Sequence, residues 1–450
     1  MNTNTARMTL YGIGLLNCIA IIGIWYINSG HLITGSEAGG LMIALGRLTG
    51  LLAQVALLLQ IVLIARIAWI EHYFGHDKMN KIHRDLGFWL LAFFFAHPLF
   101  LVLGYAARSD QSYGAQLISF INDWPDVFNA VIGIFLMVLV AISSLKIIRS
   151  RIKYEAWYSV HFLTYIGIFL VFDHQTKSGD MSSGWPLVYW LTINLGLGGL
   201  FLLYRWARPI YLRYKHQFKI EKLVSESPGV TSVYITGEKL NEFHYEPGQY
   251  AHLRFHDKNK RSLSERIGLF FPHPFSFSKA ADGKSLRFSI KSLGDFTQLV
   301  ATLTPGTKVT IAGPLGRFIQ DAAKTDKFLL IAGGIGITPV RALAEGLNAQ
   351  GKDVVMLYSA RTKADLALVE ELKAMTHVKL FCLCSDATPE EAPAIINGML
   401  DAARLKTLVP DLLDRDAYVC GPPPMMDGMI AALTSHGVPR AQIHFEKFAY

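Results

Sequence analysis

Residues 81–100, "KIHRDLGFWLLAFFFAHPLF", place a histidine near each end of an otherwise apolar helical segment. The two histidines, His83 and His97, are 14 residues apart, so they differ by about 21 Å in height along an α-helix. Fourteen steps of about 100° also return the side chain to nearly the same helix face. Because ionisable groups inside a membrane are costly and are usually kept for function, this segment predicts a membrane helix that presents two imidazoles at different depths.

The first half of the chain has six apolar segments of spanning length, since crossing about 30 Å of hydrocarbon takes about 20 helical residues. Basic residues gather in alternate loops, which is typical of the cytoplasmic side. We therefore expect a multi-pass protein of the cytoplasmic (inner) membrane, given its compact bacterial-type loops, with both termini and the polar second half in the cytoplasm. The first segment is long enough to remain as a span. The segments cover residues 8–27, 41–66, 84–105, 127–147, 155–173 and 185–205.

The charge and cysteine content exclude some classes of function. The formal net charge is +8 over 450 residues, but the basic residues lie at the ends of apolar runs, so the pattern argues for a membrane and against nucleic acid. The four cysteines are scattered, which excludes a disulfide framework or a cysteine-rich zinc site. No calcium-binding loop pattern is present, and we expect activity without an obligatory cytosolic activator.

A second histidine pair, His161 and His174, lies on the fifth apolar segment, 13 residues apart. Antiparallel spans would bring His83 level with His161 and His97 level with His174. Two imidazoles facing each other at one height are the axial ligands of a b-type haem, so the four histidines predict two stacked haems. Packing or interfacial roles are the alternative for any single histidine. A spacing of 13 is out of phase for an ideal helix, so either the helix is locally rewound, for instance at Gly167, or the two haems are approached from different angles.

From about residue 217 the pattern changes to short strands separated by turns, which is typical of a small β-barrel. In "HPFSFS", residues 273–278, Phe275 can pack on a flat ring while Ser276 offers a hydroxyl at the ring edge. In "IKSLGDFT", residues 290–297, Gly294 and Thr297 lie where a helix should begin, and backbone N–H groups there suit a diphosphate. Each stretch alone is also consistent with ordinary turn chemistry.

After residue 326 strands alternate with helices, which indicates a parallel sheet. Strands are expected within the stretches 328–339, 353–360, 377–385 and 417–426, and helices are expected at 340–351 and 364–375. The first strand runs into "GGIGITP", a glycine-rich turn that lets a pyrophosphate approach the backbone and a helix N-terminus. Its order differs from the usual G-x-G-x-x-G pattern, so it is suggestive only. The last strand ends in Cys420, Gly421 and Pro422, at the edge where open α/β sheets bind ligands.

With these motifs together, the chain resembles the NADPH oxidase and ferric reductase superfamily from about residue 40 to its end. The resemblance implies a six-helix transmembrane haem-binding bundle over residues 1–210, an FAD-binding antiparallel β-barrel over 217–322, and an NAD(P)H-binding α/β parallel-sheet domain over 326–450. The implied cofactors are FAD, two b-type haems and NADPH, with NADH as the alternative donor. The haem ligands would be the two histidine pairs.

The resemblance also implies roles for individual residues. Glu446 matches a carboxylate near the flavin, and Phe448 matches the C-terminal aromatic that stacks on it, with Tyr450 as the alternative. Cys420 matches a cysteine near the nicotinamide. The FAD positions are His273, Pro274, Phe275, Ser276, Lys291, Gly294 and Thr297. The nucleotide positions are Gly333, Gly334, Gly336, Thr338, Pro339, Cys420, Gly421 and Pro422, and Arg361 and Lys363 lie where a 2′-phosphate would be read, which favours NADPH.

Two further positions bear on the outer haem. Arg47 matches an arginine close to that haem in family oxidases, where pairing with a haem propionate is an equal interpretation. Animal oxidases carry another histidine four residues after the outer ligand, and here that residue is Leu101. This departure keeps the terminal acceptor open.

These features predict an enzyme of the lipid bilayer that moves electrons from cytoplasmic NADPH through FAD and two haems to an acceptor outside. The favoured acceptor is O2, which would give superoxide, and a ferric chelate is the alternative. A non-catalytic haem-binding membrane protein is a further alternative, but it would have no need of a hydride source. A quinone-linked cytochrome subunit would lack the second half of the chain.

Overall fold

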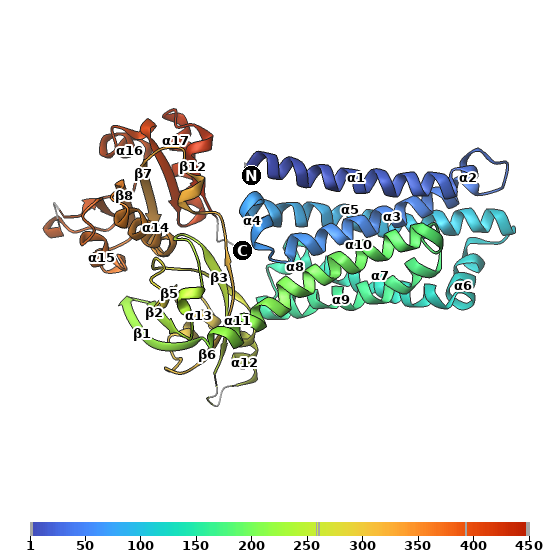
Figure 1. Cartoon of the computed structure of the whole chain (residues 1–450), viewed down its shortest axis with the longest axis horizontal. Helices are drawn as coiled ribbons and strands as arrows, with labels where there is room; N and C mark the ends of the chain where they lie inside the picture. Colours follow the sequence, from blue (N-terminus) through green and yellow to red (C-terminus); the bar gives the residue numbers. More distant parts are fainter. Residues whose placement is uncertain (1–2, 258, 260–261, 392–393, 447–450) are drawn as a thin grey trace. The chain divides into compact units, whose positions relative to one another are not determined.

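The computed structural model describes residues 3–257, 259, 262–391 and 394–446 (Figure 1). The chain forms two compact units. The first, which we call the helical unit, comprises Met1–Ala65 and Lys78–Tyr204. The second, the sheet unit, comprises Arg66–Asp77 and Arg205–Tyr450, so a short segment between the second and third spans belongs with the second half of the chain. The domain limits expected from the sequence did not include this exchange.

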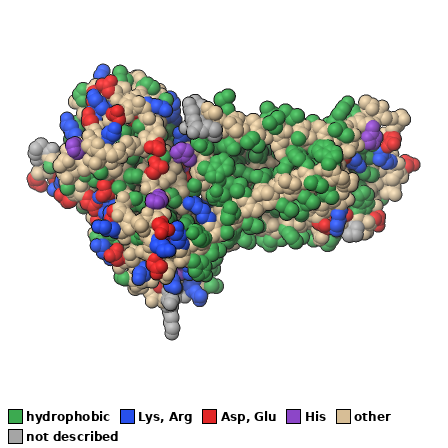
Figure 2. Space-filling model, viewed as in Figure 1, with side chains coloured by type: hydrophobic (Ala, Val, Ile, Leu, Met, Phe, Trp, Pro, Cys, Tyr) green, Lys and Arg blue, Asp and Glu red, His purple; other side chains and the backbone are tan. Residues whose placement is uncertain are grey.

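The helical unit contains six helices that are long and apolar enough to cross a membrane, as predicted. Figure 2 shows hydrophobic side chains along the visible face of this unit, which suits contact with lipid tails. The six spans lie in α1 (Thr3–Ser29), α3 (Gly40–Ile64), α5 (His76–Ser109), α7 (Pro125–Ser144), α9 (Tyr154–Lys177) and α10 (Gly184–Leu202). Shorter helices are α2 (His31–Thr34), α6 (Tyr113–Asp123) and α8 (Lys146–Arg149).

Helix α9 is unbroken, so of the two alternatives for its histidine spacing, local rewinding at Gly167 does not hold. Gly167 instead allows close packing: a Cβ on it would lie 3.0 Å from the carbonyl oxygen of Gly133 on α7, and a Cβ on Gly133 would lie 2.9 Å from that of Gly167. Small residues let two membrane helices approach backbone to backbone in this way. The only π-helical turn among the described residues follows α10, at Leu203–Ala207, and the helix then continues as α11 (Arg208–His216).

The first part of the sheet unit is an antiparallel sheet of six strands in the order β4-β3-β6-β1-β2-β5. Apolar side chains that alternate along the strands meet in one core, which includes Phe255, Phe277 and Phe288. Helix α4 (Ala68–Phe74), from the segment between spans two and three, packs against β6. The strands are β1 (Lys219–Ser227), β2 (Val230–Thr236), β3 (Tyr250–His256), β4 (His273–Ser276), β5 (Leu286–Lys291) and β6 (Lys308–Leu315), with helices α12 (Leu263–Phe270) and α13 (Asp295–Val300).

The second part is a parallel sheet in the order β10-β9-β8-β7-β11-β12 with helices on both faces. Alternate side chains of β7 face opposite layers, since Leu330 packs with α14 residues and Leu329 packs with α16 and α17 residues. The helix expected over 364–375 is shorter, because Leu368 has φ +60°, which an α-helix interior excludes. The strands are β7 (Lys327–Gly333), β8 (Asp353–Ala360), β9 (Val378–Cys384), β10 (Ile396–Asn397), β11 (Arg415–Cys420) and β12 (Ile443–Phe445), and the helices are α14 (Ile337–Ala349), α15 (Val369–Lys373), α16 (Ala402–Leu408) and α17 (Pro423–Ser435).

Candidate functional site

The structure brings the four membrane histidines together as two pairs between α5 and α9. The ring centres of His83 and His161 are 6.3 Å apart, with 45° between the ring planes. Those of His97 and His174 are 6.2 Å apart, with 59° between the planes. The pairs are those expected from antiparallel spans, and they form although the spacing of 13 residues on α9 is out of phase for an ideal helix.

The spacing of both pairs fits a six-coordinate iron between the rings. A first-row metal binds an imidazole nitrogen at about 2.0–2.1 Å, and a ring centre lies about 1.1 Å behind its nitrogen, so two coaxial rings on one iron have centres about 6.3 Å apart. The observed separations of 6.3 and 6.2 Å match this value at both heights. The separation of the rings in both pairs therefore fits two bis-histidine haems.

The outer pair is held by hydrogen bonds at the Nδ1 nitrogens of both rings. The Nδ1–H of His97 donates to the carbonyl oxygen of Gly46 on α3 at 2.7 Å. The Nδ1–H of His174 donates to the Asp126 carboxylate on α7 at 2.9 Å, and the Ser178 hydroxyl donates to the same carboxylate oxygen. Such partners fix the tautomer and orientation of a metal-binding imidazole and leave Nε2 for the metal.

The inner pair contacts other groups. Nδ1 of His161 lies 3.5 Å from the Ser144 hydroxyl, and Nδ1 of His83 is buried with no hydrogen-bond partner among the described residues. The backbone of α5 is held here by Gln60, whose amide donates to the His83 carbonyl at 2.8 Å. At the outer pair, by contrast, a carboxylate contacts a ring nitrogen of His174.

Two glycines on α3 make room for the outer histidine of α5. A Cβ on Gly50 would lie 2.6 Å from Nδ1 of His97, and a Cβ on Gly46 would lie 2.6 Å from Cδ2 of Leu101. Gly46 and Gly50 are four residues apart, the spacing at which small residues let membrane helices approach closely. The "GRLTG" stretch thus lets the α3 backbone reach the imidazole, which also explains the carbonyl contact to His97.

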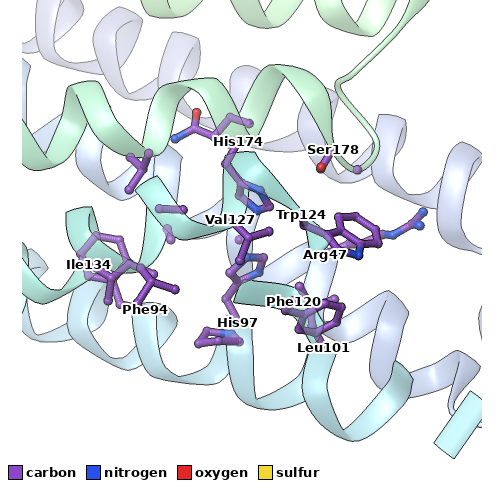
Figure 3. A pocket seen from close by; sticks show the side chains of 18 of the residues that line it. Arg47, Phe94, His97, Leu101, Phe120, Trp124, Val127, Ile134, His174 and Ser178 are labelled. Atoms are coloured by element: carbon purple, nitrogen blue, oxygen red, sulfur yellow. The ribbon is translucent and has the colours of Figure 1, made fainter. Parts of the chain in front are cut away.

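A cavity of about 260 Å³ lies beside the outer pair, lined by both His97 and His174 and mostly by apolar side chains (Figure 3). Arg47 lies in its wall, where its guanidinium donates to the buried carboxylate of Asp180 at 3.0 Å and to the Ser29 hydroxyl at 3.1 Å. Leu101 lines the same cavity one turn beyond His97. Arg47 is therefore close to the outer pair, as expected, and its charge is balanced by a residue of this chain.

Within the sheet unit, the "HPFS" residues form β4, which pairs with β3. The His273 ring stacks on Phe296 with ring centres 3.6 Å apart. Phe275 is half-buried against the barrel core, and Ser276 is buried in register with Tyr250. Pro274 lies between them, opposite His252 of β3.

The second flavin stretch forms the turn between β5 and α13. Lys291 ends β5, and Gly294 is the N-cap of α13. The Thr297 hydroxyl accepts hydrogen bonds from the N–H groups of Leu293 and Gly294 at 2.8 and 2.9 Å. These two N–H groups are thus already satisfied, so Thr297 holds the turn in shape, and a diphosphate would have to use other donors there.

The glycine-rich turn after β7 and the turn after β11 meet at the carboxyl edge of the parallel sheet. A Cβ on Gly336 would lie 2.4 Å from the Cys420 carbonyl oxygen, and a Cβ on Gly421 would lie 3.1 Å from Gly333. Gly334 has φ +52°. Because β7 and β11 are neighbours from which the chain continues in opposite directions, their turns flank the topological switch point where such sheets bind ligands. Pro422, Thr338 and Pro339 lie in the same two turns, with Thr338 donating to the Ile335 carbonyl.

Two buried carboxylates, Glu71 and Glu446, face Gly316 of the barrel. Glu71 on α4 accepts hydrogen bonds from the Tyr250 hydroxyl at 2.7 Å and the Gly316 N–H at 3.1 Å. An oxygen of Glu446 lies 3.2 Å from where a Cβ on Gly316 would be, and neither oxygen has a partner among the described residues. Burial raises the pKa of Glu71 to about 7, and burial together with the nearby Glu71 charge raises the pKa of Glu446 well above its usual value. Both carboxyl groups therefore keep a proton to a higher pH than an exposed glutamate does.

The remaining expected residues lie as follows. Cys420 ends β11, fully buried, and burial raises the pKa of its thiol, so the thiol is neutral near pH 7. Arg361 and Lys363 are exposed just after β8, next to the switch point. Phe448 and Tyr450 lie outside the described residues.

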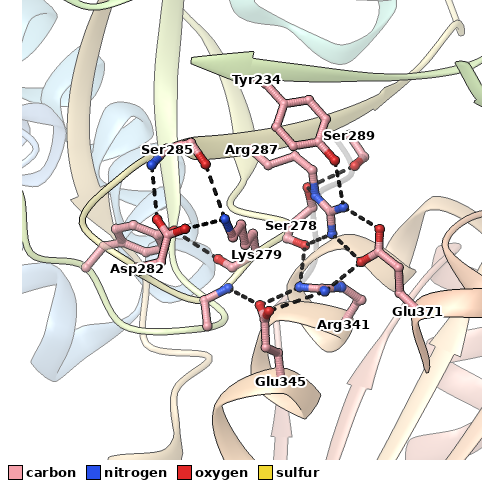
Figure 4. A network of polar contacts seen from close by, with 12 residues as sticks. Tyr234, Ser278, Lys279, Asp282, Ser285, Arg287, Ser289, Arg341, Glu345 and Glu371 are labelled. Atoms are coloured by element: carbon pink, nitrogen blue, oxygen red, sulfur yellow. Dashed lines mark hydrogen bonds and ion pairs between the residues drawn. The ribbon is translucent and has the colours of Figure 1, made fainter. Parts of the chain in front are cut away.

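A cluster of buried charges joins the barrel to the parallel-sheet part (Figure 4). Arg287 on β5 donates to both oxygens of Glu371 on α15 at 2.6 and 3.0 Å, and Arg341 on α14 contacts the same carboxylate at 2.6 Å. Arg287 also donates to the Ser278 carbonyl at 2.6 Å. Bidentate contacts of this kind fix relative orientation. The cluster therefore holds the two parts of the sheet unit in one arrangement.

Family models match all three parts of the chain. "Ferric reductase like transmembrane component" matches residues 49–172, "FAD-binding domain" matches 218–326, and "Oxidoreductase NAD-binding domain" matches 330–430. This order of domains is the architecture expected from the motifs. The chain belongs to the NADPH oxidase and ferric reductase superfamily. Members of this architecture are oxidoreductases that join a membrane domain to a flavin and nucleotide module, and this chain is such an oxidoreductase.

Two curated relatives each match about half of this superfamily member. The reductase subunit of a glycine betaine monooxygenase from Pseudomonas aeruginosa is 29% identical over 245 residues, which are 52% of this chain and 64% of that protein. A flavohemoprotein from Rhizobium meliloti is 29% identical over 220 residues, 45% of this chain and 53% of that protein. The chain thus spans less than two thirds of the length of these relatives. Among solved structures, the FAD/NAD-binding domain of a Vibrio cholerae nitric oxide dioxygenase is 24% identical, with a TM-score of 0.44, covering 51% of this chain and 97% of that one.

Sequence reasoning missed three acidic residues of the site. Asp126 supports His174, Asp180 pairs with Arg47, and Glu71 lies buried in the sheet unit. The only signal in the sequence is that Asp126 and Asp180 are acidic residues close to the ends of apolar segments. Glu71 lies in a segment assigned to a solvated loop, where a carboxylate is unremarkable.

Proposed function

We propose that this oxidoreductase carries electrons from cytoplasmic NADPH, through FAD and two b-type haems, to an acceptor on the opposite side of the inner membrane. The favoured acceptor is O2, giving superoxide. The proposal assigns residues 1–210 to the haem-binding membrane domain, 217–322 to the FAD domain and 326–450 to the NAD(P)H domain. The family match supports the coarser statement of transmembrane electron transfer.

The observation that carries the proposal is the pair of imidazole gaps between α5 and α9. Both have the width that one iron requires, and both lie inside a chain that also has flavin and nucleotide domains. A haem-binding protein without turnover would not need those domains. When bound, FAD accepts a hydride and releases electrons singly, and haem iron carries one electron at a time.

The chain's own residues would bind, orient and balance these groups. Nε2 of each of the four histidines would hold iron, with Gly46 and Asp126 orienting the outer two rings. The two turns at the switch point would receive the nucleotide diphosphate. Hydride donation followed by electron export leaves one proton per NADPH in the cytoplasm, and the Glu71 and Glu446 carboxylates are buried groups able to hold a proton there.

A ferric chelate is the second candidate acceptor. The residue one turn beyond His97 is Leu101, so the cavity wall lacks the extra imidazole of animal oxidases, and Arg47 is already paired with Asp180. Neither of these two residues therefore supplies a polar group dedicated to O2. The same electron path would then end on iron outside the protein.

The test is NADPH-driven reduction of cytochrome c by the purified, FAD-supplemented protein in air, with and without superoxide dismutase. Loss of most of the signal with dismutase supports O2 as the acceptor. An unchanged signal with reduced haems moves the proposal to the ferric chelate, which is then assayed directly. His97→Leu and His83→Leu should each remove one of two haems. If NADPH never reduces haem, the proposed path is refuted.

A further inference from the structure

Helix α12 of the sheet unit presents an apolar stripe outward. Leu263, Ile267 and Phe270 are 73%, 40% and 57% exposed. They are spaced i, i+4 and i+7, which places them on one face of a helix. After Lys215, the described residues include only three other large hydrophobic side chains with comparable exposure, Leu293, Met399 and Leu413, and each is alone in the sequence. The stripe is therefore the one place where the polar half of the chain concentrates exposed apolar surface.

The stripe belongs to a well-formed helix with a fixed orientation. Ser262 and Glu265 form a capping box at its start, with the Ser262 N–H donating to the Glu265 carboxylate at 2.8 Å. Leu269, on the opposite face, is buried in the barrel core. The inward face thus anchors α12 to the barrel, and its apolar outward face is a constant feature of this surface.

The surroundings of α12 lead to the end of a membrane span. The helix Gly184–His216 has 33 residues, so it is about 50 Å long, whereas the hydrocarbon core takes about 30 Å. Its last residues must therefore pass through the lipid headgroup region, and Trp206 lies among them, where tryptophan is favoured. The Arg254 guanidinium lies 5.8 Å from the Trp206 ring centre and 5.7 Å from that of Phe270. One arginine of β3 thus joins the apolar stripe to the headgroup level.

The charges near the stripe suit anionic lipid. Arg266 is exposed on α12 beside Ile267, and Arg208 and Arg213 lie partly exposed on α11, the part of the long helix that follows Trp206. An amphipathic helix with aromatic and aliphatic residues on one face and arginine at its border is typical of a helix that lies in the membrane interface.

We propose that α12 is an interfacial helix that seats the flavin barrel on the anionic headgroup layer of the bilayer, with Leu263, Ile267 and Phe270 inserted and Arg254 and Arg266 on phospholipid phosphates. The helix leads directly into β4, the strand of the "HPFS" residues. The contact therefore fixes the height of this strand above the membrane. This role goes beyond electron transfer and does not depend on which acceptor is used.

The test measures the depth of α12 directly. The full-length protein carries Cys18→Ser and a nitroxide label at Ile267→Cys, in nanodiscs of phosphatidylcholine with phosphatidylglycerol. The other three cysteines are buried. Leu413→Cys, which is also exposed but lies alone on the parallel-sheet part, is the matched control. The measured quantity is the accessibility ratio, which is the relaxation of the label by O2 divided by its relaxation by a water-soluble nickel complex. We expect this ratio to be several-fold higher at position 267 than at position 413.

Three results would overturn the proposal. The first is equal O2-to-nickel accessibility ratios at the two positions. The second is spin–spin broadening at position 267 that grows with protein content per disc, because a second copy of the chain would then cover the stripe. The third is an unchanged accessibility ratio when phosphatidylglycerol is omitted, because the interaction would then not depend on anionic lipid. A graded loss of the ratio in Phe270→Gln, but not in Met399→Gln, supports it.

Discussion

Replacement of Glu71 by glutamine should remove a pH-dependent loss in the free energy of unfolding of the sheet unit. The glutamine oxygen can still accept from the Tyr250 hydroxyl and the Gly316 N–H, but the side chain cannot ionise. The carboxyl has its pKa raised by burial from 4.5 to about 7. A group whose folded-state pKa is raised favours the folded state below its unfolded pKa and loses that contribution as the pH rises through the folded pKa. The affected window is therefore pH 4.5 to about 7.

The size of the effect on stability follows from this shift in the pKa of Glu71. At about 1.4 kcal/mol per pH unit, the full cost of ionising Glu71 in the folded state is about 3 kcal/mol. About 2 kcal/mol of it falls between about pH 5.5 and about pH 8. For a unit of this size, 1 kcal/mol shifts the Tm by about 2–4 °C. Wild type should therefore lose about 4–8 °C relative to Glu71→Gln across that range.

The assay is thermal unfolding of the detergent-solubilised, FAD-loaded protein, followed by the fluorescence of released flavin at several pH values. Glu370→Gln is the control, because its carboxylate is exposed and paired on the surface with Lys373. This control should track wild type at every pH. A Tm difference between wild type and Glu71→Gln that stays constant with pH would refute the reasoning, since Glu71 would then be charged, or neutral, throughout.

Three other substitutions test the remaining geometry. Asp126→Asn should remove about 1.4 kcal/mol of the preference of one of the two haems for the ferric state, because the carboxylate charge on the His174 ring is lost. For one electron this raises the midpoint potential by about 60 mV, which a redox titration measures. Gly50→Ala should lower the haem content from two to one per chain, because the new Cβ would lie 2.6 Å from Nδ1 of His97. The control is Gly12→Ala, whose new Cβ meets nothing within 4 Å and which should keep both haems. A pyridine haemochrome assay measures the haem content. Arg287→Met should cost about 3 kcal/mol of sheet-unit stability in denaturant unfolding, because it leaves a partly buried carboxylate without its bidentate partner.

The sequence was sufficient for features that depend on periodicity along one segment. The six spans follow from apolar length, and the strands of both sheets follow from alternation. The partners within each histidine pair also follow, since antiparallel helices leave only one way to match the heights of His83, His97, His161 and His174. Each of these patterns lies along a single segment of the sequence, so it can be recognised before the fold is known.

The rotation of a helix about its axis, and hence the side chains it turns inward, is predicted less well. Local rewinding at Gly167, one of the two alternatives for the histidine spacing on α9, is absent, and that glycine serves helix packing. The spacing alone could not exclude it, because it treats α9 as an isolated helix, whereas close contact with α7 decides which face of α9 turns inward.

The acidic partners could not be predicted, since each contacts a residue far away in the chain. Asp126 and His174 are 48 residues apart, Arg47 and Asp180 are 133 apart, and Glu71 and Tyr250 are 179 apart. No local spacing encodes such pairs. Burial then turns an ordinary acidic residue into a group with an altered pKa or a fixed partner, and burial is known only once the fold is known.

The difference between the two histidine pairs bears on the choice of acceptor. A carboxylate that accepts a hydrogen bond from a ligand imidazole makes that imidazole more basic and favours the more highly charged ferric iron. Asp126 supplies this to the outer pair, whereas at the inner pair the Ser144 hydroxyl lies 3.5 Å from Nδ1 of His161. With haem bound as proposed, the Asp126 carboxylate would make the outer iron a stronger electron donor, which a weak one-electron oxidant such as O2 requires more than an easily reduced ferric chelate does. Superoxide formation should therefore fall more steeply in Asp126→Asn than ferric-chelate reduction does, and equal losses in both assays would show that the carboxylate serves the fold alone.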